Sequence, residues 1–372
     1  MDPRLKAVLG FVRRFWWPLS IASFLLGLAF DLRWFIKLPA AQAFARLSNT
    51  YAWKVTNYSV NYIDFGFVKR GTLGCLMRWL PPNQRFVGAI VLYLLVFLLF
   101  VALLKFRLRD LDAPYRDALT LIAIASPLGF QNLGYDFLRY DEICLVTLAV
   151  SLILVERGVC WPMPLLAAFG ILTHEGFALY GVPVIVAQYL WLRPEEVHGQ
   201  KLSVASTRWN DIMIAAMALV GAGIAALTAI HGRSDAVGKA FDVGVSPWTM
   251  GAVIEFHPLS LWLGAIGVSV GLLALWLVLY RSAGRKLDLS FLLLFSPLGL
   301  LALATDWARF SSLNFFATLL VVPTFLRLGG RQAPAPSTGW LLAVLALFCV
   351  PLGPIGIIDF FPYVGFMVAI KH

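Results

Sequence analysis

Charged side chains are scarce in this chain, and their scarcity excludes most soluble folds. Only 13% of the 372 residues are Asp, Glu, Lys or Arg, whereas 60% are hydrophobic. A soluble globular domain carries about 25% charged residues. The mean hydropathy is correspondingly high, at +0.80. The composition therefore predicts an integral membrane protein.

Cysteine is rare as well, and its four positions are Cys75, Cys144, Cys160 and Cys349. They are widely spaced and mostly within apolar segments, which indicates small buried side chains and argues against a disulfide framework or a zinc cluster. The net charge of +10 comes from short basic clusters between apolar runs, and the sequence has no long basic arm or recognised nucleic-acid motif. We therefore expect no nucleic-acid partner.

Long apolar runs determine the expected architecture. A helix needs about 20 apolar residues to cross the hydrocarbon core, and fewer if it is bent or re-entrant, so we expect an all-α bundle of about eleven spans, some short or re-entrant. The predicted spans are 16–36, 87–105, 117–131, 143–156, 162–173, 176–192, 211–230, 259–280, 289–305, 310–327 and 339–360. We expect them to form a single transmembrane domain over residues 1–372.

The distribution of basic residues predicts the orientation of this bundle. Loops that would share the side of the N-terminus hold Lys105, Arg107 and Arg109, then Arg281 and Arg285, whereas the shorter opposite loops hold far fewer cations. Cytoplasmic loops carry the excess of Lys and Arg. The sequence therefore predicts a multi-pass protein of the plasma (inner) membrane with a cytoplasmic N-terminus.

The segment 162–192 allows two interpretations. It is either a hairpin that turns at His174-Glu175 or one long helix kinked by Pro164 and Pro183. A single helix would invert the sidedness of everything downstream, and the hairpin agrees better with the charge distribution.

The longest outside loop is expected at 37–86 and has the richest chemistry. Its first part, roughly Ala40 to Tyr58, is an amphipathic stretch that mixes apolar and aromatic residues with Arg46, Asn49 and Lys54, and it is typical of a helix lying in the membrane interface. Asp64 then precedes Lys69 and Arg70, with glycines close by that permit a tight backbone. Lys and Arg suit a phosphate group, and Asp64 can accept a proton or orient a cation. The alternative is an Asp–Arg pair that only fastens the loop to the bundle.

A second polar cluster lies between two predicted spans. It contains Asp136, Arg139, Asp141 and Glu142, so one arginine faces three carboxylates and cannot neutralise all of them. The alternative is a solvated loop in which Asp141 and Glu142 begin the next helix, where its dipole favours anions.

Two further clusters lie at predicted span ends. His174 and Glu175 adjoin in a turn between short apolar halves, where an imidazole can act as a general base, a phosphate donor or a metal ligand. Asp306 and Arg309 are three residues apart and so share one helical face as an expected ion pair. The alternative in each case is a structural role.

This layout resembles the GT-C class of integral membrane glycosyltransferases, which transfer a sugar from a polyprenyl-phosphate or -diphosphate carrier at the extracytoplasmic face. The resemblance lies in the cytoplasmic N-terminus, the first span and the large outside loop with an interfacial helix and an acid. It implies that Asp64 is the catalytic acid, that Arg70 or Lys69 lies near the carrier phosphate, and that Asp136 or Asp141 serves as a second acid. O-antigen and exopolysaccharide polymerases and ligases likewise carry Arg, His and acidic residues on the outside face. A transporter or flippase for an anionic lipid-linked substrate, or a non-catalytic scaffold, are the alternatives from other classes.

The expected site gathers these residues in one pocket. The candidate catalytic residues are Asp64, Asp136, Asp141, His174 and Glu175, and the candidate phosphate-binding residues are Lys69, Arg70, Arg139, Asp306 and Arg309. The expected partners are the lipid bilayer, a polyprenyl-linked sugar donor and a glycan, lipid or protein acceptor. Mg²⁺ binds through one or two carboxylates plus phosphate, so Mg²⁺ or Mn²⁺ is compatible with the site, although nothing in the sequence requires a cofactor.

Overall fold

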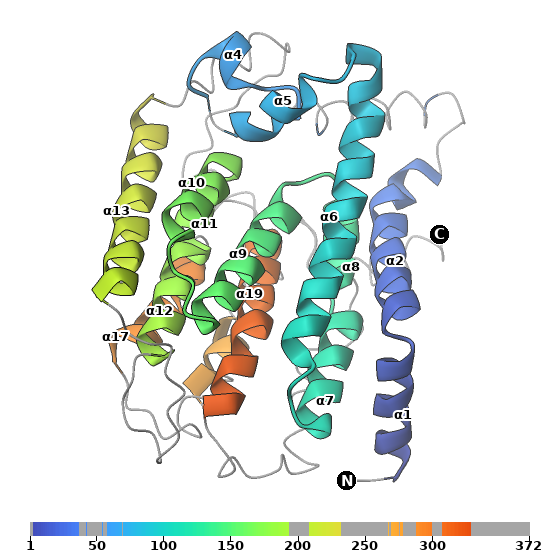
Figure 1. Cartoon of the computed structure of the whole chain (residues 1–372). Coiled ribbons are helices and arrows are strands. Elements are labelled where there is room, and N and C mark those ends of the chain that lie inside the picture. The colour runs from blue at the N-terminus through green and yellow to red at the C-terminus, as the bar shows by residue number, and fades with distance from the viewer. Residues whose placement is uncertain are drawn as a thin grey trace. The chain divides into compact units, whose positions relative to one another are not determined.

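Every regular element that the structure describes is a helix (Figure 1). The structure is a computed structural model. It describes residues 3–36, 58–68, 70–192, 208–231, 288–299 and 307–328, together with 42, 54, 267, 269–274, 276 and 277. The all-α expectation is thus confirmed for these residues. The predicted interfacial helix at 40–58 lies almost wholly outside them.

Three of the described helices are long and apolar enough to cross a membrane. They cover Pro82–Leu108, Arg208–His231 and Arg309–Arg327. A fourth span arises if the pair Lys6–Arg14 and Trp16–Leu32 is counted as one, although its halves are bent by 85°. The expected total of about eleven is not reached by the described residues. The runs at 259–280 and 339–360 lie largely or wholly outside them, and 289–305, described to residue 299, forms only the short elements Leu289–Leu293 and Ser296–Leu298. The described helices within 117–131, 143–156, 162–173 and 176–192 are each shorter than 18 residues.

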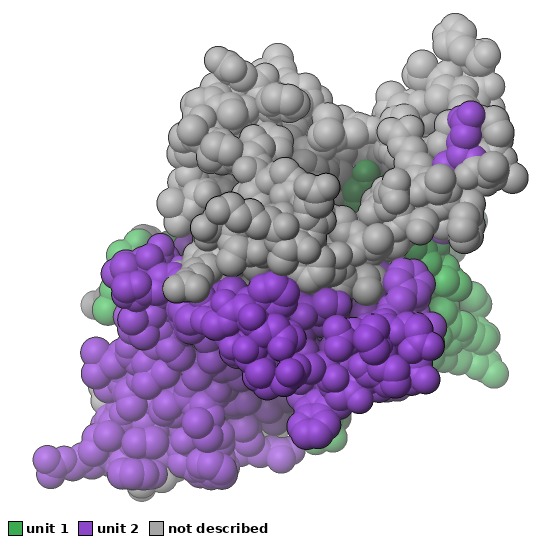
Figure 2. Space-filling view, turned by 90° about the horizontal axis from the view of Figure 1, so that it is seen from above, with its two compact units in different colours: residues 1–31, 101–137, 249–372 green, residues 32–100, 138–248 purple. Residues whose placement is uncertain are grey.

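The chain divides into two compact units, shown in green and purple in Figure 2. Unit 1 comprises 1–31, 101–137 and 249–372, and unit 2 comprises 32–100 and 138–248. The helices of unit 1 are α1 (Pro3–Arg14), most of α2 (Trp16–Ile36), the end of α6 (Arg85–Leu108), α7 (Ala113–Ala125), α8 (Phe130–Tyr135), α17 (Leu289–Leu293), η2 (Ser296–Leu298) and α19 (Trp307–Leu328). Those of unit 2 are α4 (Tyr62–Phe65), α5 (Gly71–Met77), η1 (Pro82–Gln84), most of α6, α9 (Asp141–Glu156), α10 (Met163–Thr173), α11 (Phe177–Tyr180), α12 (Val182–Leu192) and α13 (Arg208–His231).

Glycines allow α2 and α8 of unit 1 to touch backbone to backbone. A Cβ atom at Gly27 would lie 1.8 Å from the carbonyl oxygen of Gln131, and one at Gly134 would lie 1.9 Å from that of Phe24. Small residues permit such close approach between membrane helices. The hydroxyl of Ser23 adds a buried hydrogen bond of 2.7 Å to the carbonyl of Ile124.

Arg107 departs from its expected position in a cytoplasmic loop. It lies in the last turn of α6 and is buried. Its guanidinium donates to the carbonyl of Leu320 at 2.7 and 3.0 Å and to the hydroxyl of Thr324 at 2.9 Å. A buried charge requires such partners, so Arg107 ties α6 to α19 within unit 1.

The segment 162–192 forms the hairpin (Figure 1). Near the start of α9, the thiol of Cys144 contacts the carbonyl of Gly170, close to the end of α10. Near the end of α9, the carbonyl of Leu152 accepts a hydrogen bond of 2.8 Å from Gln188 on α12. The chain must therefore reverse between 170 and 188, which excludes one continuous helix. At 11 residues, α10 and α12 are each about 16 Å long, roughly half the thickness of the hydrocarbon core.

Candidate functional site

In unit 2, the loop that carries Asp64 and Arg70 is fastened to the turn of this hairpin. We call residues 58–80 the docked loop; position 69 within it lies outside the described residues. The hydroxyl of Tyr62 donates to the carbonyl of Leu172 at 3.3 Å and lies 3.2 Å from the hydroxyl of Thr72. Arg70 binds Glu175 across 105 positions of sequence. The structure therefore brings Arg70 and Glu175 into direct contact.

Asp64 is held by two neighbours in the docked loop. Asn61 caps α4, since its side-chain oxygen accepts from the amides of Ile63 and Asp64 at 3.0 and 2.8 Å. The same side chain donates through Nδ2 to Asp64 Oδ2 at 2.8 Å. The other carboxylate oxygen lies 3.2 Å from Arg78 Nη2, and both side chains of this pair are nearly half exposed. Asp64 thus combines a fixed orientation with access to solvent.

Gly74 determines how closely α5 approaches the rest of the docked loop. A Cβ atom at this position would lie 1.6 Å from the carbonyl oxygen of Val60, so only glycine fits without a backbone shift. The contact places α5, which ends just before Arg78, directly against the backbone of Val60, four residues before Asp64. The Asp64–Arg78 pair therefore depends on this backbone contact.

Arg70 has the geometry of a fixed, bidentate ligand for a carboxylate. Its backbone adopts a left-handed conformation with φ of 63° at the start of α5. Its Nε and Nη2 atoms donate to the two oxygens of Glu175 at 3.1 and 2.9 Å. Burial opposes ionisation of Glu175, but the charge of Arg70 and its hydrogen bonds to the carboxylate outweigh it and hold the pKa of this carboxyl well below its usual range.

This lowered pKa predicts how the pair contributes to stability at different pH values. Glu175→Gln should decrease the free energy of unfolding by about 1–3 kcal/mol at neutral pH, because a charged hydrogen-bonded pair is lost. The stabilisation is fully present above the unfolded-state pKa of about 4.3 and disappears only as pH falls through the lower folded-state value.

Thermal unfolding of the purified protein can check this dependence. The difference in midpoint between wild type and Glu175→Gln should stay constant from about pH 8 to about pH 5.5 and shrink in more acidic buffer. Asp112→Asn, which alters an exposed acid before α7, serves as the control. A difference that grows on acidification would contradict the assigned pair.

His174 is the buried member of the hairpin turn. It follows α10 in an extended conformation with φ of −153° and is only 3% exposed. Its Nδ1 accepts a hydrogen bond of 3.0 Å from the amide of Gly176, so a neutral ring carries its proton on Nε2. The ring is thereby fixed next to Glu175.

The 139–142 cluster is connected to the docked loop through Tyr58. The Tyr58 hydroxyl donates to the carbonyl of Arg139 at 3.0 Å, and its ring lies 5.2 Å from that of Tyr140. Burial, with neighbouring acidic groups, raises the pKa of Tyr58 well above its usual value, so this hydroxyl keeps its proton. Asp141 and Glu142 are buried in the first turn of α9, and Glu142 accepts a hydrogen bond from the Tyr93 hydroxyl on α6.

The remaining predicted site residues lie in unit 1 or outside the described residues. Asp136 at the end of α8 and Arg309 near the start of α19 are buried in unit 1. Lys69 and Asp306 lie outside the described residues. Among those that are described, no group of three or more His, Cys, Asp or Glu side chains is suited to a metal ion. Because Mg²⁺ needs only one or two carboxylates beside a phosphate, the divalent cation stays a prediction.

Sequence reasoning missed the two residues that hold Asp64. The signal for Asn61 was available, since Asn followed three residues later by an acid is a helix-start pattern. Arg78 gives no such signal. Its partner Asp64 is 14 positions away, and the two residues do not share a helix, so no helical spacing links them.

Comparison with known proteins adds no relative to this description. No protein-family model matches the chain, and no curated protein or solved structure matches it. By its fold, the chain is therefore a helical protein with helices long and apolar enough to cross a membrane.

Proposed function

We propose that this protein is a membrane glycosyltransferase of the cell envelope that transfers a sugar from a polyprenyl-phosphate or -diphosphate carrier to an acceptor hydroxyl. The observation that carries the proposal is the docked loop, whose Asp64 and Arg78 stand on a fixed backbone and whose Arg70 binds the hairpin turn beside His174. Residues more than 100 positions apart are thereby held in one unit. A loop that served only as a connection would not need this arrangement.

Exposed apolar side chains on the docked loop support a lipid-linked substrate. Trp79 is 88% exposed, and Ile63, Phe67 and Leu76 are also exposed. Large exposed apolar side chains next to charged groups suit a membrane interface, where one part of a molecule meets lipid and another meets water. A polyprenyl phosphate has the same two-part character.

In the proposed reaction, Asp64 accepts the proton of the acceptor hydroxyl as its oxygen attacks the anomeric carbon of the donor sugar. The bond between that carbon and the carrier phosphate oxygen breaks, and the electron pair stays on the phosphate. Arg78 lies beside Asp64 and is nearly half exposed, so it is placed to stabilise the negative charge that develops on the leaving group. Arg70, paired with Glu175, positions the segment that leads into α5.

A reaction with purified protein and a polyprenyl-phosphate-linked radiolabelled sugar tests the proposal. Covalent attachment of the sugar to a lipid, glycan or peptide acceptor, with stoichiometric release of polyprenyl phosphate, is the expected result. A transporter or flippase would instead move the intact donor across the bilayer of proteoliposomes and form no new glycosidic bond. That outcome would replace the transferase with a carrier.

A further inference from the structure

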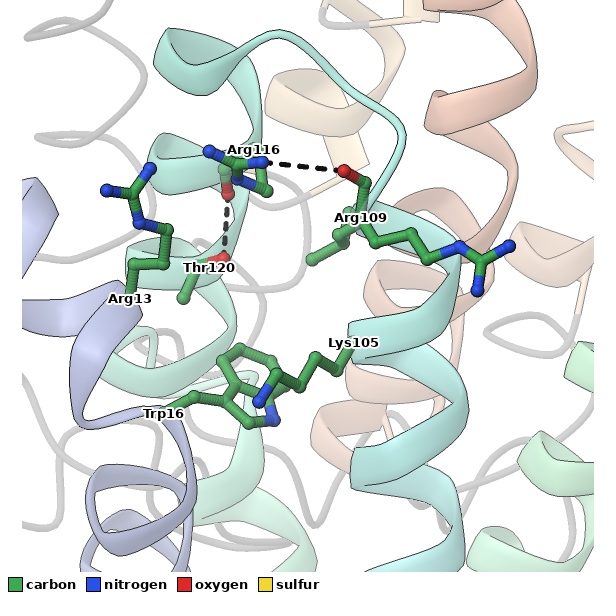
Figure 3. A pocket seen from close by; sticks show the side chains of 7 residues that line it. Arg13, Trp16, Lys105, Arg109, Arg116 and Thr120 are labelled. Atoms are coloured by element: carbon green, nitrogen blue, oxygen red, sulfur yellow. Dashed lines mark hydrogen bonds between the residues drawn. The ribbon is translucent and has the colours of Figure 1, made fainter.

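A small cavity in unit 1 is surrounded by cations that the proposed reaction does not use (Figure 3). It has a volume of about 190 Å³ and lies between the junction of α1 and α2, the last turn of α6 and the start of α7. Arg13, Lys105, Arg109 and Arg116 line it, and no carboxylate is among the lining residues that the structure describes. The lining therefore favours an anion.

The acids of this region neutralise only part of that charge. Asp117 lies 3.7 Å from Arg13 and 3.3 Å from Arg116, so one carboxylate is shared by two guanidinium groups. Arg109 pairs with Asp110 at 3.2 Å in an exposed turn. The Lys105 ammonium lies 5.9 Å from the ring of Trp17, a contact that leaves its charge in place. A positive excess remains around the cavity.

Two hydrogen bonds fix Arg116 at the cavity wall. The Thr120 hydroxyl donates to the backbone carbonyl of Arg116 at 2.7 Å. The Arg116 guanidinium donates through Nη1 to the carbonyl of Arg109 at 3.4 Å, a long bond that an anion with better geometry can replace (Figure 3). The side chain is about three-quarters buried, which reduces screening by water.

Trp16 supplies independent support for a ligand. This side chain is 2% exposed and lines the cavity, and its indole Nε1 has no hydrogen-bond partner among the residues that the structure describes. A buried N–H without an acceptor costs free energy, so such groups usually serve a bound partner. The partner must be an acceptor, because indole can only donate.

The surroundings indicate where this acceptor comes from. Helix α1 exposes Val8 and Phe11, at 50% and 54%, next to the basic residues of the same helix, and it bends by 85° away from α2. A basic helix with exposed apolar side chains lies in the membrane interface. Basic pockets at the ends of cytoplasmic membrane helices bind anionic headgroups. We propose that the cavity binds the phosphate of an anionic lipid headgroup, with Arg13, Arg116 and Trp16 among the side chains that line it and can donate to the ligand.

Titration of the purified full-length protein with short-chain lipids tests this site. Dihexanoyl phosphatidylglycerol should bind measurably by calorimetry, whereas dihexanoyl phosphatidylcholine, whose phosphate is compensated by a cation, should bind at least about tenfold more weakly. Arg116→Gln should weaken phosphatidylglycerol binding by about tenfold or more, since a charge-assisted contact is lost. Trp16→Phe, which keeps the ring and removes only the N–H, should weaken it about threefold.

Arg14→Gln is the matched control, because Arg14 is the next residue of α1, carries the same charge, is exposed and does not line the cavity. It should change the affinity less than about twofold. Equal affinity of wild type, Arg116→Gln and Trp16→Phe would overturn the site, provided that thermal unfolding shows all three to be folded. Binding of inorganic phosphate as tight as that of phosphatidylglycerol would overturn the lipid as its source.

Discussion

Asp64→Asn should reduce glycosyl transfer by about 10²–10⁴-fold while leaving the protein folded, because the amide cannot accept a proton from the acceptor hydroxyl. The substitution keeps the shape of the side chain and its contact with Asn61. The rate should be measured at saturating donor and acceptor in purified protein. Asp110→Asn, which changes an exposed acid in the turn after α6, should leave the rate unchanged.

A charge exchange separates catalysis from simple attachment of the loop. In the double variant Asp64→Arg/Arg78→Asp, the ion pair can form again with its partners reversed. If the pair only fastens the docked loop, the exchange should restore function lost in the single variants. If Asp64 acts on the acceptor, the exchanged protein should regain thermal stability and stay inactive. Wild-type product formation by folded Asp64→Asn would remove Asp64 from the mechanism.

Gly74→Ala should disrupt the docked loop more than the addition of a methyl group at any other position within it. The added Cβ would overlap the carbonyl oxygen of Val60 at 1.6 Å, and relief requires a backbone shift. Overpacking of this kind costs about 1–3 kcal/mol. We expect a lower unfolding midpoint and loss of transfer that approaches the loss in Asp64→Asn.

Limited digestion with trypsin can locate the damage, since Arg78 lies just after α5. Cleavage at Arg78 should become faster in Gly74→Ala. Gly223→Ala is the control, because a Cβ atom there meets nothing within 4 Å and alanine favours the helix by up to about 1 kcal/mol. Equal cleavage of the two variants would show that the close contact does not hold the loop.

The long helices could be predicted because their apolar runs are continuous. Those at 87–105, 211–230 and 310–327 match α6, α13 and α19 within a few residues. The hairpin at His174-Glu175 could also be predicted, because it agrees better than one long helix with the distribution of basic residues. The polar pair between two short apolar halves marks the position of the turn. The separate helices at 113–125 and 130–135 replace the predicted span 117–131, because Ser126-Pro127 interrupts the hydrogen-bond ladder there.

The partners within the site could not be predicted, because they depend on contacts between distant segments. Sequence gives the kinds of side chain, and Arg70 was expected to meet a phosphate. Its bidentate partner in the structure is Glu175, which was placed among the catalytic candidates. Arg107 is likewise predicted in a cytoplasmic loop, and only the packing of α19 against α6 reveals its buried acceptors.

The short arms of the hairpin also constrain how the protein enters the membrane during synthesis. The two arms, Met163–Thr173 and Phe177–Leu192, are both shorter than the about 20 residues of a self-sufficient span, so neither should be retained by the insertion machinery alone. The two arms must partition together, with Gln188 satisfied by α9, which is already synthesised when α12 emerges. Because a hairpin returns the chain to the side from which it came, failure of both arms to insert would not reverse the sidedness of α13. Such a failure would instead leave His174 and Glu175 out of contact with the docked loop.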